Sequence, residues 1–405
     1  MDTIVVVGAG LDVHKKTVVA CVIKGQITTQ MVKRTFKTFL HDLEQLRDWL
    51  KEQGVTHVAM ESTGVYWMPV YRVLEDAFTL VLGNARHMAN VPGRKTDASD
   101  AEWIATLLRY GLIRANFVPP SAIRQLRQMT RFRRRLIDSR TAAQLRVQKL
   151  LESTNIKLGS VASEVFGVSG RLMLAALASG ISDPKALADL AKAKLRNKIH
   201  DLERAFAGRL TRDEARLLDL QLQVVESLEQ RLADVDDALR RAVAPHEPLL
   251  AHLQTVPGIG RTSAIEILAE IGTDMTPWPN EDHFVAWAGL APGNSQTANK
   301  RRRVKSRDGD TYLKSTLWRA ATSAIKTDAY LARRFGRIRA RRNAFVATLA
   351  IAHHLGLAIY LMIKRHETYK TPAVADPEIH RKREAQKLTK RLEKLGYLVT
   401  CTNAR

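Results

Sequence analysis

Residues 3–24 read TIVVVGAGLDVHKKTVVACVIK, which is two runs of β-branched and small apolar residues separated by a short polar turn. Such runs are typical of neighbouring strands. Similar patterns continue for about a hundred residues and alternate with helical spacing, which predicts an α/β domain. The predicted strands cover residues 3–13, 17–24, 26–36, 55–61 and 78–82, and the predicted helices cover residues 39–53, 65–76 and 97–110.

The two glycines in the first run, Gly8 and Gly10, follow an apolar strand and suggest a dinucleotide-binding loop. The third glycine of that fingerprint would fall at Val13, so the match fails. We therefore look for the function of this domain in its acidic residues.

The middle of the chain changes character, because residues 121–244 are rich in Leu, Ala, Arg and Gln at helical spacing. Pro184 marks the start of one helix there. Between residues 217 and 243, apolar residues recur at steps of three or four, which is typical of a coiled coil or a helical bundle. This segment either joins two protomers or forms an antiparallel hairpin within one chain.

The fold class that follows is α/β plus α. We expect an α/β domain over residues 1–120, a helical and coiled-coil domain over residues 121–244, and a mostly helical C-terminal domain over residues 245–370. A charged tail, residues 371–405, completes the chain.

Charge points to a polyanionic partner, because 64 Lys and Arg against 41 Asp and Glu give a formal net charge of +23. Between residues 300 and 342 there are 15 Lys and Arg but 3 Asp and Glu. Phosphate contacts explain such a stripe better than solubility does. Two cysteines, the absence of an uninterrupted apolar stretch of about 20 residues and an acidic Asp2 where a secretory signal would be basic predict a globular cytoplasmic protein that does not span a membrane.

Four acidic residues fall where a metal-dependent nuclease would place them. Asp12 lies near the end of one predicted strand, Glu61 ends another, and Asp97 and Asp100 lie one helical turn apart. Ribonuclease-H-like folds present their carboxylates in this way, and such oxygen ligands suit one or two Mg²⁺ ions. Each residue alone would more often serve as a helix cap or a turn residue. As a set in this order of strands and helices, the four residues favour a metal site instead.

The motifs GLDVHKK (residues 10–16), MESTGVYW (60–67) and KTDASDA (95–101) resemble those of the DEDD insertion-sequence transposases, the IS110 family. The similarity extends over residues 8–365 and includes TRFRR (130–134), NIKL (155–158) and FGVSG (166–170). The resemblance implies a RuvC-like N-terminal domain, a coiled-coil insertion, and a C-terminal domain that supplies a hydroxyl nucleophile. It also implies a structured bridge RNA that pairs with target and donor DNA.

The segment LQTVPGIG (residues 253–260) and the helical pattern after it predict a helix-hairpin-helix turn. Gly258 and Gly260 would let the backbone approach a phosphate at a helix N-terminus, next to Arg261. An ordinary glycine-containing helix connection is the alternative.

The resemblance places a nucleophilic serine shortly before a lysine, but here the corresponding residue is Thr297, followed by Asn299 and Lys300. The nearest serine is Ser295. Three interpretations remain: Thr297 attacks, Ser295 attacks through a shifted loop, or this copy is impaired. The basic residues that follow, Lys300, Arg301, Arg302 and Arg303, would neutralise the phosphate. A second basic group lies largely on one side of a predicted helix and would grip the backbone of DNA or RNA, or form a solvated helix face: Arg333, Arg334, Arg337, Arg341 and Arg342.

The leading hypothesis is a transposase that cuts and rejoins DNA through a covalent hydroxyl–phosphate intermediate and works as a homo-oligomer, a dimer or a tetramer. One alternative is a RuvC-like junction nuclease in which metal-bound water attacks. The other is a non-catalytic nucleic-acid-binding protein.

Overall fold

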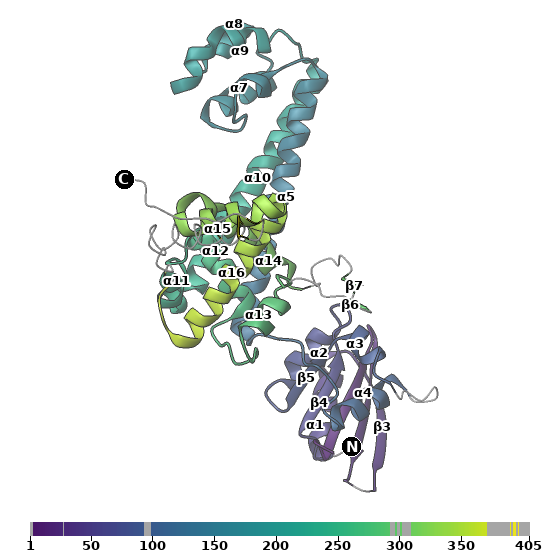
Figure 1. Ribbon diagram of the computed structural model, residues 1–405. Coiled ribbons are helices and arrows are strands. Elements are labelled where there is room, and N and C mark those ends of the chain that lie inside the picture. The colour runs from purple at the N-terminus through teal and green to yellow at the C-terminus, as the bar shows by residue number, and fades with distance from the viewer. Residues whose placement is uncertain are drawn as a thin grey trace. The chain divides into compact units, whose positions relative to one another are not determined.

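The computed structural model describes residues 3–26, 28–92, 99–291, 296–297, 300–301 and 309–370, and residues 389, 392, 393 and 396. The chain divides into two compact units, residues 1–118 and 119–405 (Figure 1). The first unit is a mixed α/β fold and the second is mostly helical, as the sequence predicts. The finer domain boundaries at residues 244 and 370 stay predictions.

The first unit contains a five-stranded sheet in the order β3-β2-β1-β4-β5. The central strand β1 pairs antiparallel with β2 and parallel with β4. Strand β3 pairs antiparallel with β2, and β5 pairs parallel with β4. The strands are β1 (Val7–Val13), β2 (Thr17–Lys24), β3 (Gln30–Lys37), β4 (His57–Glu61) and β5 (Thr79–Gly83).

Helices cover both faces of this sheet. On one face, α1 (Leu40–Glu52) and α2 (Trp67–Leu74) contribute to an apolar core with alternate residues of β1 and β4, such as Leu11 and Met60. On the other face, α4 (Asp100–Arg109) packs against β1, β2 and β4. The short helix α3 (Ala85–Ala89) contributes Met88 to the second face.

Two predicted strands begin too early in the sequence, at residues 3 and 26. Strand β1 begins at Val7, because the residues before it leave the sheet: the Ile4 side chain is exposed, and its N–H donates to the Arg109 carbonyl at 2.8 Å. Strand β3 begins at Gln30 because Gly25 adopts φ 91°, which ends β2 in a turn. A β-propensity pattern does not reveal such a turn when apolar residues continue through it.

The second unit is built on a long antiparallel hairpin of α5 (Ser121–Ser153) and α10 (Arg212–Ala242). Leu218, Val225, Leu232 and Leu239 are buried at seven-residue intervals, as in a coiled coil. Arg133 and Asp236 pair across the hairpin with 2.5 Å between Nε and Oδ1. The coiled-coil pattern therefore forms an internal hairpin, one of the two predicted arrangements.

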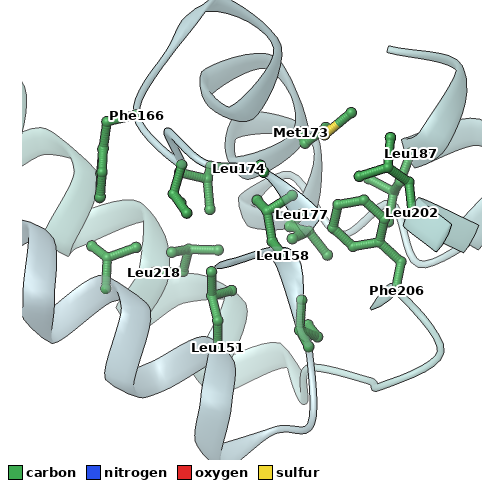
Figure 2. Packing of buried hydrophobic residues seen from close by; sticks show 14 of the residues in the cluster. Leu151, Leu158, Phe166, Met173, Leu174, Leu177, Leu187, Leu202, Phe206 and Leu218 are labelled. Carbon is green, nitrogen blue, oxygen red and sulfur yellow. The ribbon is translucent and has the colours of Figure 1, made fainter. Parts of the chain in front are cut away.

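Short helices lie at the far end of the hairpin (Figure 1). Apolar side chains of these helices and of the residues between them, including Phe166, Leu174 and Phe206, pack with Leu151 of α5 and Leu218 of α10 into one core (Figure 2). The elements are α6 (Leu158–Val161), α7 (Val168–Ala178), α8 (Pro184–Asp189), the 3-10 helix η1 (Ala193–Lys198) and α9 (Ile199–Ala205).

The other end of the hairpin is surrounded by the C-terminal helices (Figure 1). Helix α16 is long and apolar enough to cross a membrane by length and composition alone, but 56% of its most apolar stretch is buried inside the protein. It is the core helix of this part, packed against α13, α14 and α15. The elements are η2 (Ala244–His246), α11 (Glu247–Leu253), α12 (Arg261–Ile271), α13 (Glu281–Trp287), β6 (Gln296–Thr297), β7 (Lys300–Arg301), α14 (Thr311–Thr327), α15 (Ala329–Arg341) and α16 (Ala344–Arg365).

Candidate functional site

Asp12 and Glu61 lie at the same edge and on the same face of the sheet. Strands β1 and β4 run parallel, so their carboxyl ends meet at one edge. Glu61 ends β4 two residues after Ala59, which packs against α4. Asp12 likewise shares its face with Gly10, which α4 touches. Both carboxylates therefore belong to the face that α4 covers.

Helix α4 brings a third carboxylate to this edge. It runs antiparallel to β1, since a Cβ at Gly8 would meet Leu108, while a Cβ at Gly10 would meet Ala101 and Ala105. The carbonyl oxygen of Ala101 would be 2.2 Å from that Cβ, so glycine at position 10 permits the close approach. The first residue of α4, Asp100, consequently lies toward Asp12.

The electrostatics of Asp12 are consistent with this convergence. Burial raises the pKa of the Asp12 carboxyl above its usual value, and the charges of Asp100 and Glu61 raise it further. His14 opposes these effects, because its Nε2 lies 3.1 Å from Asp12 Oδ2. Two elements, α4 and β4, thus place carboxylates where they act on Asp12 of β1.

Hydrogen-bonded neighbours orient two of these carboxylates. The Thr63 hydroxyl donates to Glu61 Oε1, and His14 contacts Asp12. Sequence reasoning did not assign a role to either residue, although both lie inside the motifs that carry the acidic groups. Their proximity in sequence, two residues from each acid, was the available signal.

The described residues bring together part of the predicted metal-binding set. Asp12, Glu61 and Asp100 share an edge, whereas Asp97 lies outside the described residues. Within the described ranges, no group of three or more His, Cys, Asp or Glu side chains is close enough together to hold a metal ion. The donors are nevertheless oxygen atoms of carboxylates, which is the chemistry that Mg²⁺ prefers.

The predicted hairpin turn lies between α11 and α12, and its two glycines differ. Gly258 has φ 79°, and a Cβ there would lie 2.2 Å from the Ala320 carbonyl of α14, so this glycine allows close packing inside the unit. Gly260 is the exposed N-cap of α12, and a Cβ there would meet open space among the described atoms. Arg261 follows it and forms an ion pair with Glu247, with 2.8 Å between Nη1 and Oε2.

The predicted nucleophile loop is described only at a short hairpin. Thr297 of β6 pairs with Lys300 of β7, next to Arg301. Ser295, Arg302 and Arg303 lie outside the described residues. The hairpin places the threonine opposite a lysine in the backbone register.

The arginines predicted to grip nucleic acid split into two groups. Arg333 and Arg337 of α15 are exposed, as are Arg341 and Arg342 at its end. Arg334 instead points inward, where its Nη1 lies 3.4 Å from His354 Nδ1. Burial, together with the charge of Arg334, lowers the pKa of His354 to about 4, so the ring is neutral beside the guanidinium at neutral pH.

An α/β unit with carboxylates at one sheet edge and a helical unit with a basic exposed helix are typical of enzymes that act on nucleic acid. Two family models match the chain. One, described as "Transposase", covers residues 9–156, and the other, "Transposase IS116/IS110/IS902 family", covers residues 250–337.

Curated relatives agree with these matches. The transposase for insertion sequence element IS1111A of Coxiella burnetii is 25% identical over 291 residues, 70% of each chain. The putative transposase y4pF/y4sB of Sinorhizobium fredii is 27% identical over 288 residues, which are 68% of this chain and 64% of that protein. The chain therefore belongs to the IS110 family of DEDD transposases and is a DNA transposase.

Proposed function

We propose that this transposase cuts and rejoins DNA through a covalent intermediate between a protein hydroxyl and a DNA phosphate. Its first unit is proposed to be a RuvC-like, ribonuclease-H-like domain with a divalent-metal site. The observation that carries the proposal is the convergence of Asp12, Glu61 and Asp100 from β1, β4 and α4 at one sheet edge. Asp97, in the same motif as Asp100, is proposed as the fourth acid.

The carboxylates are proposed to hold one or two Mg²⁺ ions. Burial is the main cause of the raised pKa of Asp12, and the charges of Asp100 and Glu61 add to it, so a cation bound at this edge would offset both effects. A bound divalent cation would supply positive charge beside a scissile phosphate. His14 would hold Asp12 in place, and Thr63 would orient Glu61.

Thr297 is the proposed nucleophile, and Ser295 is the second candidate. In the reaction, the hydroxyl oxygen bonds to phosphorus while the bond between phosphorus and the departing strand's oxygen breaks. The hydroxyl proton leaves, and the departing oxygen takes one up. Lys300, which pairs with Thr297 across the hairpin, and the adjacent Arg301 would neutralise the phosphate.

Covalent trapping tests this mechanism. The protein is incubated with radiolabelled element-end DNA and Mg²⁺ and denatured, and the label that stays with the protein is counted. Wild type should retain label, and Thr297→Ala should lose it. Thr297→Ser should retain it, because removing the methyl group relieves crowding at the attacking oxygen.

Ser295→Ala is the matched control on the same loop and should behave as wild type. Loss of label in Ser295→Ala with retention in Thr297→Ala would move the nucleophile to Ser295. Cleavage of DNA by wild type with no attached label would contradict the covalent mechanism and support the junction nuclease.

We also propose, on the resemblance, that a structured bridge RNA guides the enzyme and that the enzyme is a cytoplasmic homo-oligomer. The net charge of +23 and the exposed arginines of α15 support a nucleic-acid surface. The turn from α11 into α12, with Gly260 exposed, supports a helix-hairpin-helix contact to a DNA phosphate. Leu217, Leu220 and Val224 support self-association, because they form an exposed apolar stripe on α10.

A further inference from the structure

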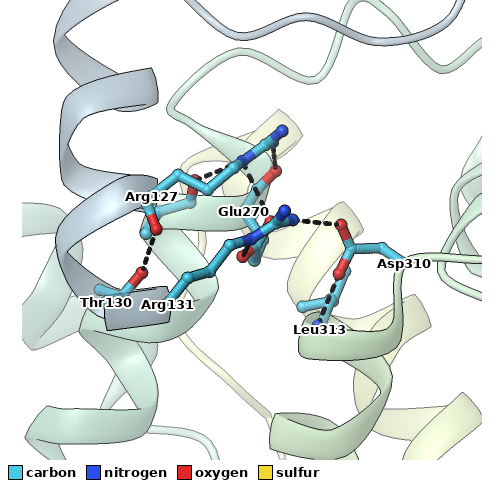
Figure 3. Close-up of polar contacts among 7 residues, drawn as sticks. Arg127, Thr130, Arg131, Glu270, Asp310 and Leu313 are labelled. Carbon is cyan, nitrogen blue, oxygen red and sulfur yellow. Dashed lines mark hydrogen bonds and ion pairs between the residues drawn. The ribbon is translucent and has the colours of Figure 1, made fainter. Parts of the chain in front are cut away.

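Four charged side chains from three helices form one ion-paired set in the second unit (Figure 3). Arg131 of α5 binds Glu270 of α12 through two hydrogen bonds, Nε to Oε1 at 2.9 Å and Nη2 to Oε2 at 2.8 Å. The same Nη2 donates to Asp310 Oδ2 at 3.2 Å. Arg127 Nε lies 3.0 Å from Glu270 Oε2. We call these four residues the ionic bridge.

The two carboxylates of the ionic bridge are buried, with side-chain exposures of 3% for Glu270 and 10% for Asp310, while Arg127 and Arg131 are partly exposed, at 17% and 30%. Burial raises the pKa of the Glu270 carboxyl, and its hydrogen bonds with Arg131 oppose that effect. A buried ion pair seldom stabilises a fold more than apolar residues of the same size would. Bidentate pairing does fix the relative orientation of the groups it joins.

Asp310 stands where the chain returns from the loop that carries Thr297. Its carboxylate accepts from the Leu313 N–H at 2.8 Å and so caps α14, and its own N–H donates to the Trp287 carbonyl at 3.2 Å. Next to it, a Cβ at Gly309 would lie 2.3 Å from the Gly289 nitrogen. The residues before the loop and after it are therefore in direct contact.

The ionic bridge connects this contact to α12, the helix that follows the predicted hairpin turn. Glu270 lies in the last turn of α12, whose N-cap is Gly260. Arg131 stacks over the ring of Tyr312 in the first turn of α14, with 4.3 Å from Cζ to the ring centroid. One guanidinium thus links α5, the end of α12 and the start of α14, immediately after the loop.

We propose that the ionic bridge is a positioning device for the nucleophile loop: through Asp310, Arg131 and Glu270 fix the closed base of that loop and so the orientation of the Thr297 hairpin. This rests on the proposed function of Thr297. These residues touch no substrate. Removing the bridge should leave DNA binding intact and lower the rate at which the hydroxyl attacks.

The key variant is Asp310→Asn, because asparagine still caps α14 while it loses the charge that Arg131 binds. Arg131→Gln is the reciprocal variant. The matched control is Arg133→Gln, two residues further along the same helix, which breaks the partly buried pair with Asp236 but touches no residue at the loop base. All three proteins are full-length and are compared for thermal unfolding before other measurements.

The first measurement is the single-turnover rate of label attachment at saturating DNA, beside the Kd for the same DNA. Asp310→Asn and Arg131→Gln should lower the rate about 10- to 100-fold with little change in Kd. Arg133→Gln should match wild type. An unchanged rate in folded Asp310→Asn, or an equal loss in Arg133→Gln, would overturn the proposal.

The second measurement is amide hydrogen exchange in the free protein, which is independent of activity. Exchange at residues 296–301 should be faster in Asp310→Asn than in wild type and Arg133→Gln. Exchange equal to wild type would overturn the positioning role. If wild type attaches no DNA, the proposed nucleophile fails, and the exchange data still decide whether the bridge holds the loop base.

Discussion

At the scale of single residues, Gly10 links the fold to the site. Gly10 resembles a glycine of a dinucleotide-binding loop, but its role here is in packing. Because it has no side chain, α4 can lie against β1. That contact fixes the start of α4 and therefore the place of Asp100. A strand motif that looks like a phosphate-binding loop is in fact a packing site beneath the carboxylates.

Gly10→Ala should therefore destabilise the protein by about 1–3 kcal/mol, because the new Cβ would overlap the backbone of Ala101 and Ala105. It should also lower activity, since α4 must move. Thermal unfolding and strand cleavage measure the two effects.

Gly336→Ala is the control. This exposed glycine lies in α15, where a Cβ would meet open space among the described atoms, and alanine there should raise stability by up to about 1 kcal/mol. If Gly10→Ala unfolds at the wild-type temperature, the close approach of α4 to β1 is wrong.

The positions of Asp12, Glu61 and Asp100 could be predicted from the sequence because each lies at or next to the end of a strand or the start of a helix. The residues that orient them could not, because His14 and Thr63 act through side-chain rotamers that no periodicity encodes. The sequence pattern did not predict the ionic bridge either, because its residues lie far apart in the chain. Arg131 is separated from Glu270 by 139 residues and from Asp310 by 179.

At the scale of elements, the order of strands and helices in the first unit follows from hydrophobic alternation, and the differences are at turns. The coiled-coil pattern of α10 predicted that one face of this helix packs against another helix. It did not predict whether that helix belongs to the same chain or to a second protomer. The buried seven-residue series from Leu218 to Leu239 faces α5 of the same chain. A second apolar series on α10, the stripe of Leu217, Leu220 and Val224, stays exposed.

This exposed stripe predicts self-association through α10. Leu220→Glu combined with Val224→Glu should shift the protein toward single chains, because charged side chains oppose burial of the stripe against a second copy. The mass of the particles in solution is the measurement, made before and after ribonuclease treatment so that bound RNA is detected in the same experiment.

Leu145→Glu is the matched control, because Leu145 is also an exposed apolar residue, on the partner helix α5, but lies outside the stripe. It should leave the mass unchanged. A wild-type mass of one chain at micromolar concentration would contradict self-association, and a mass unaffected by ribonuclease would argue against a bound RNA.

At the scale of the whole molecule, two units carry different parts of the proposed reaction. The first contributes carboxylates on a rigid sheet, and the second contributes the hydroxyl loop, the ionic bridge and the exposed arginines of α15. The net charge of +23 belongs to the chain as a whole and predicted a nucleic-acid partner, which the membership of a transposase family bears out for DNA.

The most direct measurement is Mg²⁺-dependent cleavage of element-end DNA by wild type and Asp12→Asn, with DNA affinity measured in parallel. Asparagine keeps the size of the side chain and removes its charge. Cleavage should require Mg²⁺ and should fall at least about 100-fold in the variant, while Kd stays close to wild type. Cleavage by Asp12→Asn at the wild-type rate, or cleavage by wild type without a divalent cation, would contradict the assignment of the acidic site.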